Sequence, residues 1–94
     1  MAAKLSDAEI EQHLKDVTGW AREGNAIRKS FSFAKFADGI RFVDRVAAAA
    51  DELDHHPDVD IRYTTVTMTL STHSAGGLTR KDFELAARIE RALR

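Results

Sequence analysis

The chain has 94 residues and no cysteine, and its 14 basic and 15 acidic residues give a formal net charge of -1. Without cysteine it has neither disulfides nor thiolate metal ligands, and no cysteine nucleophile. The charges are interspersed, and the basic patch typical of nucleic-acid binding is missing, so direct binding of DNA or RNA is not expected. No apolar run approaches the roughly 20 residues that span a bilayer, and no signal-peptide pattern is present. We therefore expect a single cytoplasmic domain over residues 1–94 without membrane association.

The N-terminal third predicts one helix and one hairpin. Ser6-Asp7-Ala8-Glu9 has the capping-box form, and apolar residues then repeat at helical spacing as far as Val17, before Gly19 ends the helix. His13 on this helix is expected to be a solvated surface residue. Strands are predicted over residues 20–22 and 26–33, where apolar and polar residues alternate around the turn Glu23-Gly24-Asn25.

The middle of the chain predicts a long helix from about residue 36. Apolar residues fall on one stripe that we expect to face the core, namely Phe36, Ile40, Val43, Ala47, Ala50 and Leu53. Pro57 cannot continue a helix, and the residue before a proline is pushed toward extended geometry. His55 and His56 should therefore lie at the exit of this helix.

The C-terminal third predicts a second hairpin and a last helix. Residues 59–63 and 66–70 alternate between apolar and polar side chains, and Gly76-Gly77 ends the second of these strands. Thr79 can cap a final helix whose apolar stripe is Phe83, Ala86, Ile89 and Leu93. The element order α-β-β-α-β-β-α predicts an α+β fold, a four-stranded antiparallel sheet with helices packed on one face.

Three histidines lie at predicted element ends, His55 and His56 after the long helix and His73 after the last strand. Imidazole, with an ordinary pKa of about 6.5, donates and accepts protons near neutral pH, so such a group suits acid and base chemistry. Asp82, in the first turn of the last helix, can orient one imidazole or stabilise its protonated form. Purely structural interpretations remain open here. A histidine at a helix exit can cap the helix and interact with its dipole, and Asp82 can be a capping partner of Thr79.

The pattern Asp51, His55-His56-Pro57, Tyr63, His73 and Asp82 resembles the signature of the pterin-4a-carbinolamine dehydratases. The stretch 70–79 is also similar to the strand-to-helix crossing of that family, and length and element order agree. The resemblance implies a hydro-lyase that dehydrates 4a-hydroxytetrahydropterin to the quinonoid dihydropterin, without a metal or other cofactor. It also implies a pterin substrate, a functional link to an aromatic amino acid hydroxylase, and a homodimer or homotetramer.

The resemblance also implies the site residues. The three histidines form the catalytic group, with His55 and His73 as the acid/base pair and His56 positioning the pterin. The implied substrate-binding residues are Asp51, His55, His56, Pro57, Thr72, His73, Ser74, Ala75 and Asp82, and we expect the backbone amides of residues 72–75 to pair with the edge of the pterin. The chain departs from the family twice: Val59-Asp60 replaces an aromatic pair of many relatives, and Asp51 replaces the commoner glutamate.

Two other functions are weighed against the dehydratase. The first is a zinc hydrolase, because three histidines equal the protein ligands of a catalytic zinc. Against it, adjacent histidines usually point in different directions, and the chain has no histidine pair at helical i, i+4 spacing. The second is an oligomeric binding module or transcriptional dimerisation cofactor without essential catalysis, a role that an animal member of the family has beside its activity.

Self-association is expected on size alone. A domain this small draws only about 3 to 5 kcal/mol from its core, and exposed sheet edges invite pairing with another chain. The run Ala47-Ala48-Ala49-Ala50 would let another element approach closely. These features predict a symmetric homo-oligomer, a tetramer built from dimers.

Overall fold

The computed structural model describes residues 3–94. In this range the chain forms α1 (Asp7–Leu14), β1 (Ala21–Glu23), β2 (Ala26–Ser32), α2 (Phe36–Leu53), β3 (Asp58–Arg62), β4 (Thr65–Leu70), η1 (His73–Ala75) and α3 (Arg80–Ala92). The α+β class and the predicted order of helices and strands are confirmed, and each predicted strand end lies within one residue of the observed one. The short 3-10 helix η1 was not predicted.

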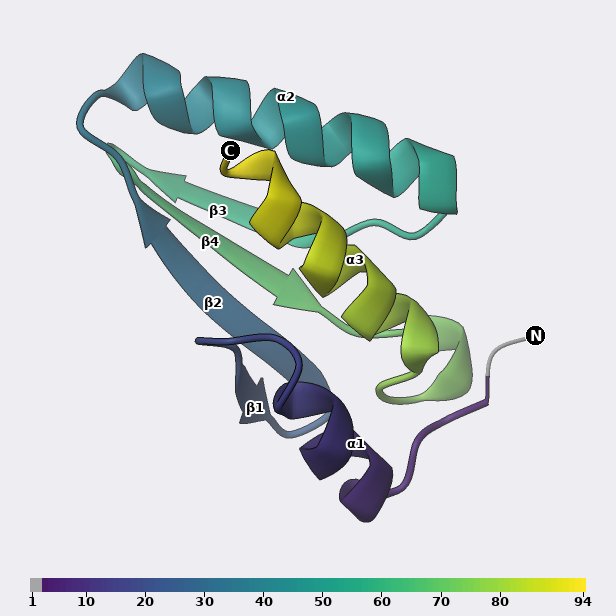
Figure 1. The fold of residues 1–94 in the computed structure, drawn as a ribbon. Coiled ribbons are helices and arrows are strands. Elements are labelled where there is room, and N and C mark those ends of the chain that lie inside the picture. The colour runs from purple at the N-terminus through teal and green to yellow at the C-terminus, as the bar shows by residue number, and fades with distance from the viewer. Residues whose placement is uncertain (1–2) are drawn as a thin grey trace.

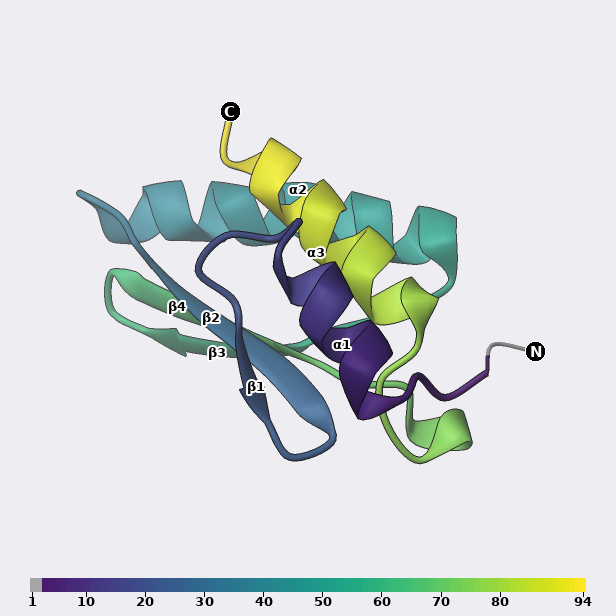
Figure 2. The same ribbon diagram turned by 60° about the horizontal axis from the view of Figure 1, so that its bottom comes forward.

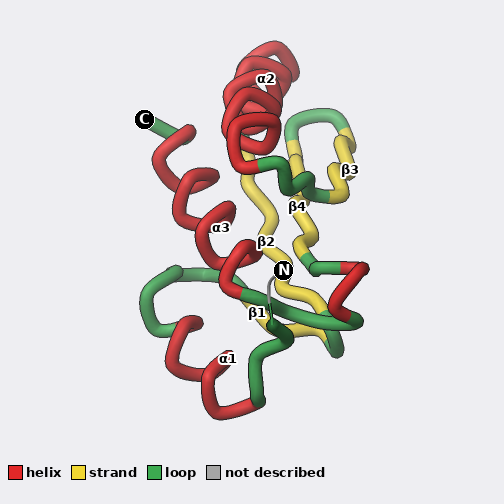
Figure 3. The backbone as a smooth tube through the Cα atoms, turned by 90° about the vertical axis from the view of Figure 1, so that its right-hand side faces the viewer, coloured by secondary structure: helices red, strands yellow, loops and turns green. Residues whose placement is uncertain are grey.

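The strands form one antiparallel sheet in the order β1-β2-β4-β3. β2 and β4 pair along their length, from Ile27 opposite Leu70 to Ser32 opposite Thr65, so each hairpin contributes one central and one edge strand. All three α helices lie on the same face of the sheet (Figures 1 and 2). Seen from the side, the helices form one layer and the strands the other (Figure 3).

The start of α1 follows from local chemistry. The Ser6 hydroxyl accepts a hydrogen bond from the Glu9 amide at 3.2 Å, and the Glu9 carboxylate accepts one from the Ser6 amide at 2.9 Å. This reciprocal pair satisfies two amides that a helix end would otherwise leave unpaired. The bond from the Ser6 backbone holds the pKa of Glu9 below its usual range. The predicted capping box is therefore present.

The core lies between the helices and the inner face of the sheet. Its largest fully buried apolar side chains are Ile10, Ile27, Phe42, Val46, Val66, Met68, Leu70, Leu78, Leu85 and Ile89. The opposite face of the sheet is polar, and there Ser30 and Thr67 share a hydrogen bond of 2.8 Å between their hydroxyls. Neither α2 nor any other helix within residues 3–94 is long and apolar enough to cross a membrane.

The predicted inward stripe of α2 is only partly right. Ala50 is buried and Val43 and Leu53 pack against the core, but the centre of the buried face is rotated about the helix axis. The buried residues are Gly39, Phe42, Val46, Ala49 and Ala50, whereas Phe36 is 50% exposed and Ala47 is exposed. Glycine at position 39 permits this orientation, because a Cβ there would lie 3.3 Å from Cγ2 of Val66. Two neighbouring rows of the helix are both apolar, so periodicity alone indicated a face but not its centre.

His13 also departs from its prediction. Its side chain is half-buried rather than solvated, and its ring stacks on Phe83 with centroids 5.0 Å apart and planes inclined by 22°. The contact forms because α1 packs beside the first turns of α3, a neighbour that the local sequence does not reveal. His13 therefore contributes to the packing of these two helices.

The orientation of α2 can be tested with two identical substitutions on the same helix. Phe42→Ala removes a fully buried ring and is expected to lower the free energy of unfolding by about 3–5 kcal/mol. Phe36→Ala removes a half-exposed ring and should cost about 1 kcal/mol or less. Urea denaturation measures both, and equal losses would contradict the observed rotation.

Candidate active site

The end of α2 separates the two adjacent histidines. Asp54 adopts a left-handed backbone, φ 51° and ψ 44°, and the amide of His55 then donates to the carbonyl of Ala50 at 3.0 Å. Aspartate is among the few residue types other than glycine that take this conformation at modest cost. Pro57 prevents any return to helix. The turn sends the side chains of His55 and His56 toward different neighbours.

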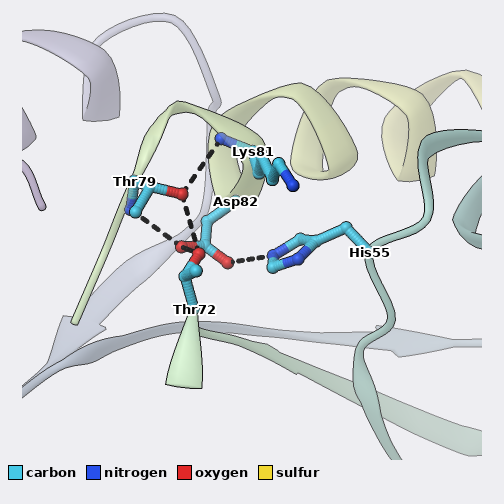
Figure 4. A network of polar contacts seen from close by, with 5 residues as sticks. All are labelled: His55, Thr72, Thr79, Lys81 and Asp82. Atoms are coloured by element: carbon cyan, nitrogen blue, oxygen red, sulfur yellow. Dashed lines mark hydrogen bonds and ion pairs between the residues drawn. The ribbon is translucent and has the colours of Figure 1, made fainter. Parts of the chain in front are cut away.

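His55 faces a buried carboxylate. Its Nε2 lies 2.6 Å from Oδ1 of Asp82, whose side chain is fully buried, while the His55 side chain is 11% exposed (Figure 4). The other oxygen, Oδ2, accepts hydrogen bonds from the Thr72 hydroxyl at 2.8 Å and from the Thr79 amide at 2.9 Å. Three donors therefore replace the water that burial removes from this carboxylate.

Asp82 combines the two roles that the sequence left open. Through Oδ2 it closes a capping box with Thr79 at the start of α3. Through Oδ1 it contacts His55 at the exit of α2. One buried side chain thus joins the beginning of one helix to the end of another, and it fixes the imidazole against α3.

His56 lies in a different environment. Its Nε2 is 2.8 Å from Oδ1 of Asp51, and the two side chains are 57% and 79% exposed. Both residues border a groove of ≈ 190 Å³ between α2 and β3, whose other walls are Val43, Val46, Ala47, Ala50, Pro57 and Val59. Val59, at one of the two positions where we expected a departure from the family pattern, forms part of this wall. The groove is apolar except at the Asp51–His56 end.

His73 begins η1 and is exposed. The loop around it is closed by its own backbone, since the Thr72 amide donates to the Gly77 carbonyl at 2.9 Å and the Ala75 amide donates to the Thr72 carbonyl at 3.0 Å. These bonds occupy two of the amides that we expected to pair with a ligand. Within the described part of the chain, the amides of His73 and Ser74 remain for that task.

The predicted site residues thus fall into three neighbouring groups rather than one. His55, Thr72 and Asp82 are in direct contact; Asp51, His56 and Pro57 border the groove; His73, Ser74 and Ala75 form the loop that follows Thr72. No hydrogen bond in residues 3–94 joins any two of the three histidines to one another. Across the same residues, no three histidine, cysteine, aspartate or glutamate side chains are placed to hold a metal ion, an arrangement that the zinc hydrolase requires.

One feature of the site was not predicted. The hydroxyls of Thr72 and Thr79 lie 2.7 Å apart and belong to the hydrogen-bond network of Asp82. The sequence indicated Thr79 only as a helix cap and Thr72 only through its backbone. Tyr63, which belongs to the signature, lies in the β3–β4 turn with φ 51° and is 77% exposed.

Sequence comparison relates the chain to a known family. A sequence profile of the family described as Pterin 4 alpha carbinolamine dehydratase matches residues 3–92. A protein of Roseiflexus castenholzii is 59% identical over 90 residues, which cover 96% of this chain and 97% of that protein. A protein of Sulfolobus acidocaldarius is 46% identical over 88 residues, which cover 94% and 97%. Both bear the provisional name pterin-4-alpha-carbinolamine dehydratase.

Solved structures share the fold. A crystal structure described as transcriptional coactivator/pterin dehydratase from Brucella melitensis has a TM-score of 0.92 and 32% identity, covering 97% of this chain and 99% of that one. A pterin dehydratase-like protein, described as a RuBisCO assembly factor in the alpha-carboxysome, has a TM-score of 0.68 and 27% identity, covering 80% and 89%. Proteins with catalytic and with assembly descriptions therefore share this architecture.

The chain offers a matched pair of aspartates, each bonded to a histidine, for testing the buried network. Asp82→Ala leaves several buried donors without an acceptor and is expected to lower the free energy of unfolding by about 3–5 kcal/mol. Asp51→Ala breaks an exposed pair and should cost about 1 kcal/mol or less. Guanidinium denaturation of both variants measures the difference, and a loss for Asp82→Ala no larger than that for Asp51→Ala would refute this account of the network.

Proposed function

The chain belongs to the pterin 4 alpha carbinolamine dehydratase family, and we propose that it dehydrates a 4a-hydroxytetrahydropterin to the quinonoid dihydropterin. The observation that carries the proposal is the family match over residues 3–92, supported by identities of 46% to 59% with proteins that bear the dehydratase name. The proposed source of the substrate is an aromatic amino acid hydroxylase, which leaves its pterin cofactor in this hydroxylated form.

The reaction requires one proton to be given and one to be taken. Protonation of the C4a hydroxyl allows the C–O bond to break with loss of water, and removal of the N5 proton allows the C4a–N5 double bond to form. The net change is the loss of one water molecule, without oxidation or reduction. Positioned acid and base groups supply about a hundred- to ten-thousand-fold acceleration. This is adequate, because the dehydration already proceeds slowly in water.

We assign the acid and base roles to His55 and His73. The buried contact with Asp82 supports the role of His55, because a carboxylate bonded to one ring nitrogen holds the imidazole in one orientation. His73 follows Thr72 directly, so its loop is attached to the same network, and its exposed side chain is accessible to a substrate. His56, paired with Asp51 in a solvated position, is assigned to binding and orienting the pterin.

We also propose that the chain forms a homo-oligomer. All residues of β3 are exposed, although β3 belongs to the sheet, and it presents Val59 and Ile61 at 41% and 39% exposure. The exposed row of α2, with Phe36 and Ala47, adds a second uncovered apolar surface. Apolar surface of this kind on a small domain favours burial against another copy.

The residues of β3 suit pairing with a second β3. An antiparallel pair centred on Ile61 places Ile61 opposite its own copy and Asp60 opposite Arg62 on both sides of the symmetry axis. Opposite charges and apolar side chains placed across from each other stabilise paired strands. Such a pair is symmetric, so it leaves α2 free for a second interface and a tetramer of two dimers.

A second candidate function is that of a binding module. The observation that favours it is the similarity to the pterin dehydratase-like protein described as a RuBisCO assembly factor. Catalysis remains the better-supported function, because relatives of much higher identity bear the dehydratase name. Replacement of His55 and His73 separates the two, since a scaffold without catalysis keeps its biological effect after these changes.

His73→Ala is expected to keep the fold and to lose about a hundredfold or more in kcat, as expected for removal of an acid or base. Dehydration of chemically generated 4a-hydroxytetrahydropterin measures turnover, and circular dichroism monitors folding. His56→Ala is the comparison variant and should raise KM more than it lowers kcat. Wild-type turnover by folded His73→Ala would remove His73 from the mechanism.

Light scattering behind a sizing column is expected to give about four times the 10.5 kDa mass of one chain. Ile61→Lys places a charge at the centre of the proposed strand pair and should halve that mass. Ala21→Lys, on the opposite edge strand, serves as the control and should leave the mass unchanged. A monomer at micromolar concentration contradicts the association, and a stable wild-type dimer contradicts the tetramer alone.

A further inference from the structure

The polar side chains around Asp82 form a chain of hydrogen bonds with a defined direction (Figure 4). The Lys81 amide donates to the Thr79 hydroxyl at 3.3 Å, and the hydroxyls of Thr79 and Thr72 are 2.7 Å apart. The Thr72 hydroxyl donates to Oδ2 of Asp82 at 2.8 Å. Thr72, Thr79 and Asp82 are all buried, so no solvent competes for these bonds.

The number of hydrogens determines the direction. A hydroxyl has one hydrogen to donate, and Thr72 uses its hydrogen on Asp82. Thr72 must then accept from Thr79, so the Thr79 hydrogen points at Thr72. Thr79 in turn accepts from the Lys81 amide, which can only donate. The series therefore runs one way, from Lys81 through both threonines to Asp82.

The donors around Asp82 leave one of its oxygens for His55. Oδ2 already accepts from the Thr72 hydroxyl and the Thr79 amide. Oδ1 is left for Nε2 of His55 at 2.6 Å, and an ionised carboxylate can only accept. Nε2 must then carry a hydrogen, which in the neutral ring leaves the lone pair on Nδ1.

Nδ1 of His55 is accessible to solvent. Among residues 3–94, every buried side-chain nitrogen or oxygen has a hydrogen-bond partner, and Nδ1 forms no hydrogen bond with this part of the chain. Since no buried nitrogen or oxygen of these residues lacks a partner, the unpaired Nδ1 is not buried and is open to water or to a ligand. The ring thus has one nitrogen committed to the interior and one presented outward.

We propose that the hydroxyl series from Thr79 through Thr72 to Asp82 holds neutral His55 as the Nε2–H tautomer, so that Nδ1 exchanges the proton with the substrate. Thr72 and Thr79 are then positioning residues that act through Asp82. The role of Nδ1 in proton transfer rests on the proposed dehydratase function. The tautomer itself does not, since it follows from the hydrogen-bond network around an ionised Asp82.

The first test is the tautomer in the unmodified protein. Long-range proton–nitrogen NMR of the full chain, with nitrogen-15 in the histidine rings, distinguishes a protonated nitrogen from one with a lone pair. His55→Gln identifies the His55 signals by their loss. The expected result is a hydrogen on Nε2 and a lone pair on Nδ1 when the ring is neutral. A hydrogen on Nδ1 would overturn the proposal.

The second test removes the Thr72 hydroxyl. Thr72→Val keeps the side-chain size but removes a donor that stabilises the ionised form of Asp82. A neutral Asp82 can donate to Nε2, so His55 should shift toward a mixture of tautomers, while kcat falls about five- to tenfold, as expected for one hydrogen bond, and KM stays within about twofold. Thr72→Ser restores the hydroxyl and should restore both properties. An unchanged tautomer in folded Thr72→Val, or a failure of Thr72→Ser to restore the wild-type properties, would overturn the proposed role of the hydroxyl series.

Thr67→Val is the matched control. Thr67 is a buried threonine of β4 whose hydroxyl also pairs with a hydroxyl, that of Ser30 at 2.8 Å, on the opposite face of the sheet. Thr67→Val should leave the His55 tautomer and kcat unchanged, and effects equal to those of Thr72→Val would overturn the proposal.

The outcomes also separate this proposal from the proposed function. An inactive wild-type chain with the Nε2–H tautomer would contradict the dehydratase while supporting the role of the hydroxyl series. If Thr72→Val does not fold, the wild-type spectrum decides.

Discussion

The burial of one carboxylate organises the functional end of this molecule. Asp82 has no exposed surface, and an ionised group in such a position is tolerated only when donors replace its lost water. Those donors come from the exit of α2, the end of β4 and the start of α3. Meeting this requirement brings together three segments that are far apart in the sequence, so the geometry around His55 and the packing of the last helix depend on the same bonds.

The left-handed residue Asp54 gives two adjacent histidines two environments. His55 turns inward to the Asp82 network, and His56 turns outward to Asp51 beside the groove between α2 and β3. The turn at Asp54 follows the last turn of α2 and directs the two rings to different neighbours, His55 to α3 and His56 to α2. One ring is thereby held rigidly by buried partners, and the other keeps the freedom of a solvated side chain.

The same fold occurs in proteins described as dehydratase, as coactivator and as assembly factor. In this chain the buried histidine network and the uncovered apolar residues are separate features, although Ala47 and Val59 also border the groove beside His56. The histidine network lies at the junction of α2, α3 and η1, whereas the uncovered apolar residues lie on β3 and the outer row of α2. A fold does not by itself determine function, and the proposed catalysis rests on the buried network around Asp82.

The sequence by itself predicted the α helices, the strands and their order, and it placed His55, His56 and His73 at element ends, because capping, proline geometry and strand alternation are local effects. Ser6, Pro57 and Thr79 each act within a few residues of their own position. The rotation of α2 was decided only by tertiary packing, since two adjacent rows of the helix are apolar and the row with Gly39, Phe42 and Val46 is the buried one. The stacking of His13 on Phe83 has the same origin. The hydroxyl series through Thr72 and Thr79 was likewise hidden, because the direction of a hydroxyl depends on acceptors that only the folded chain brings within reach.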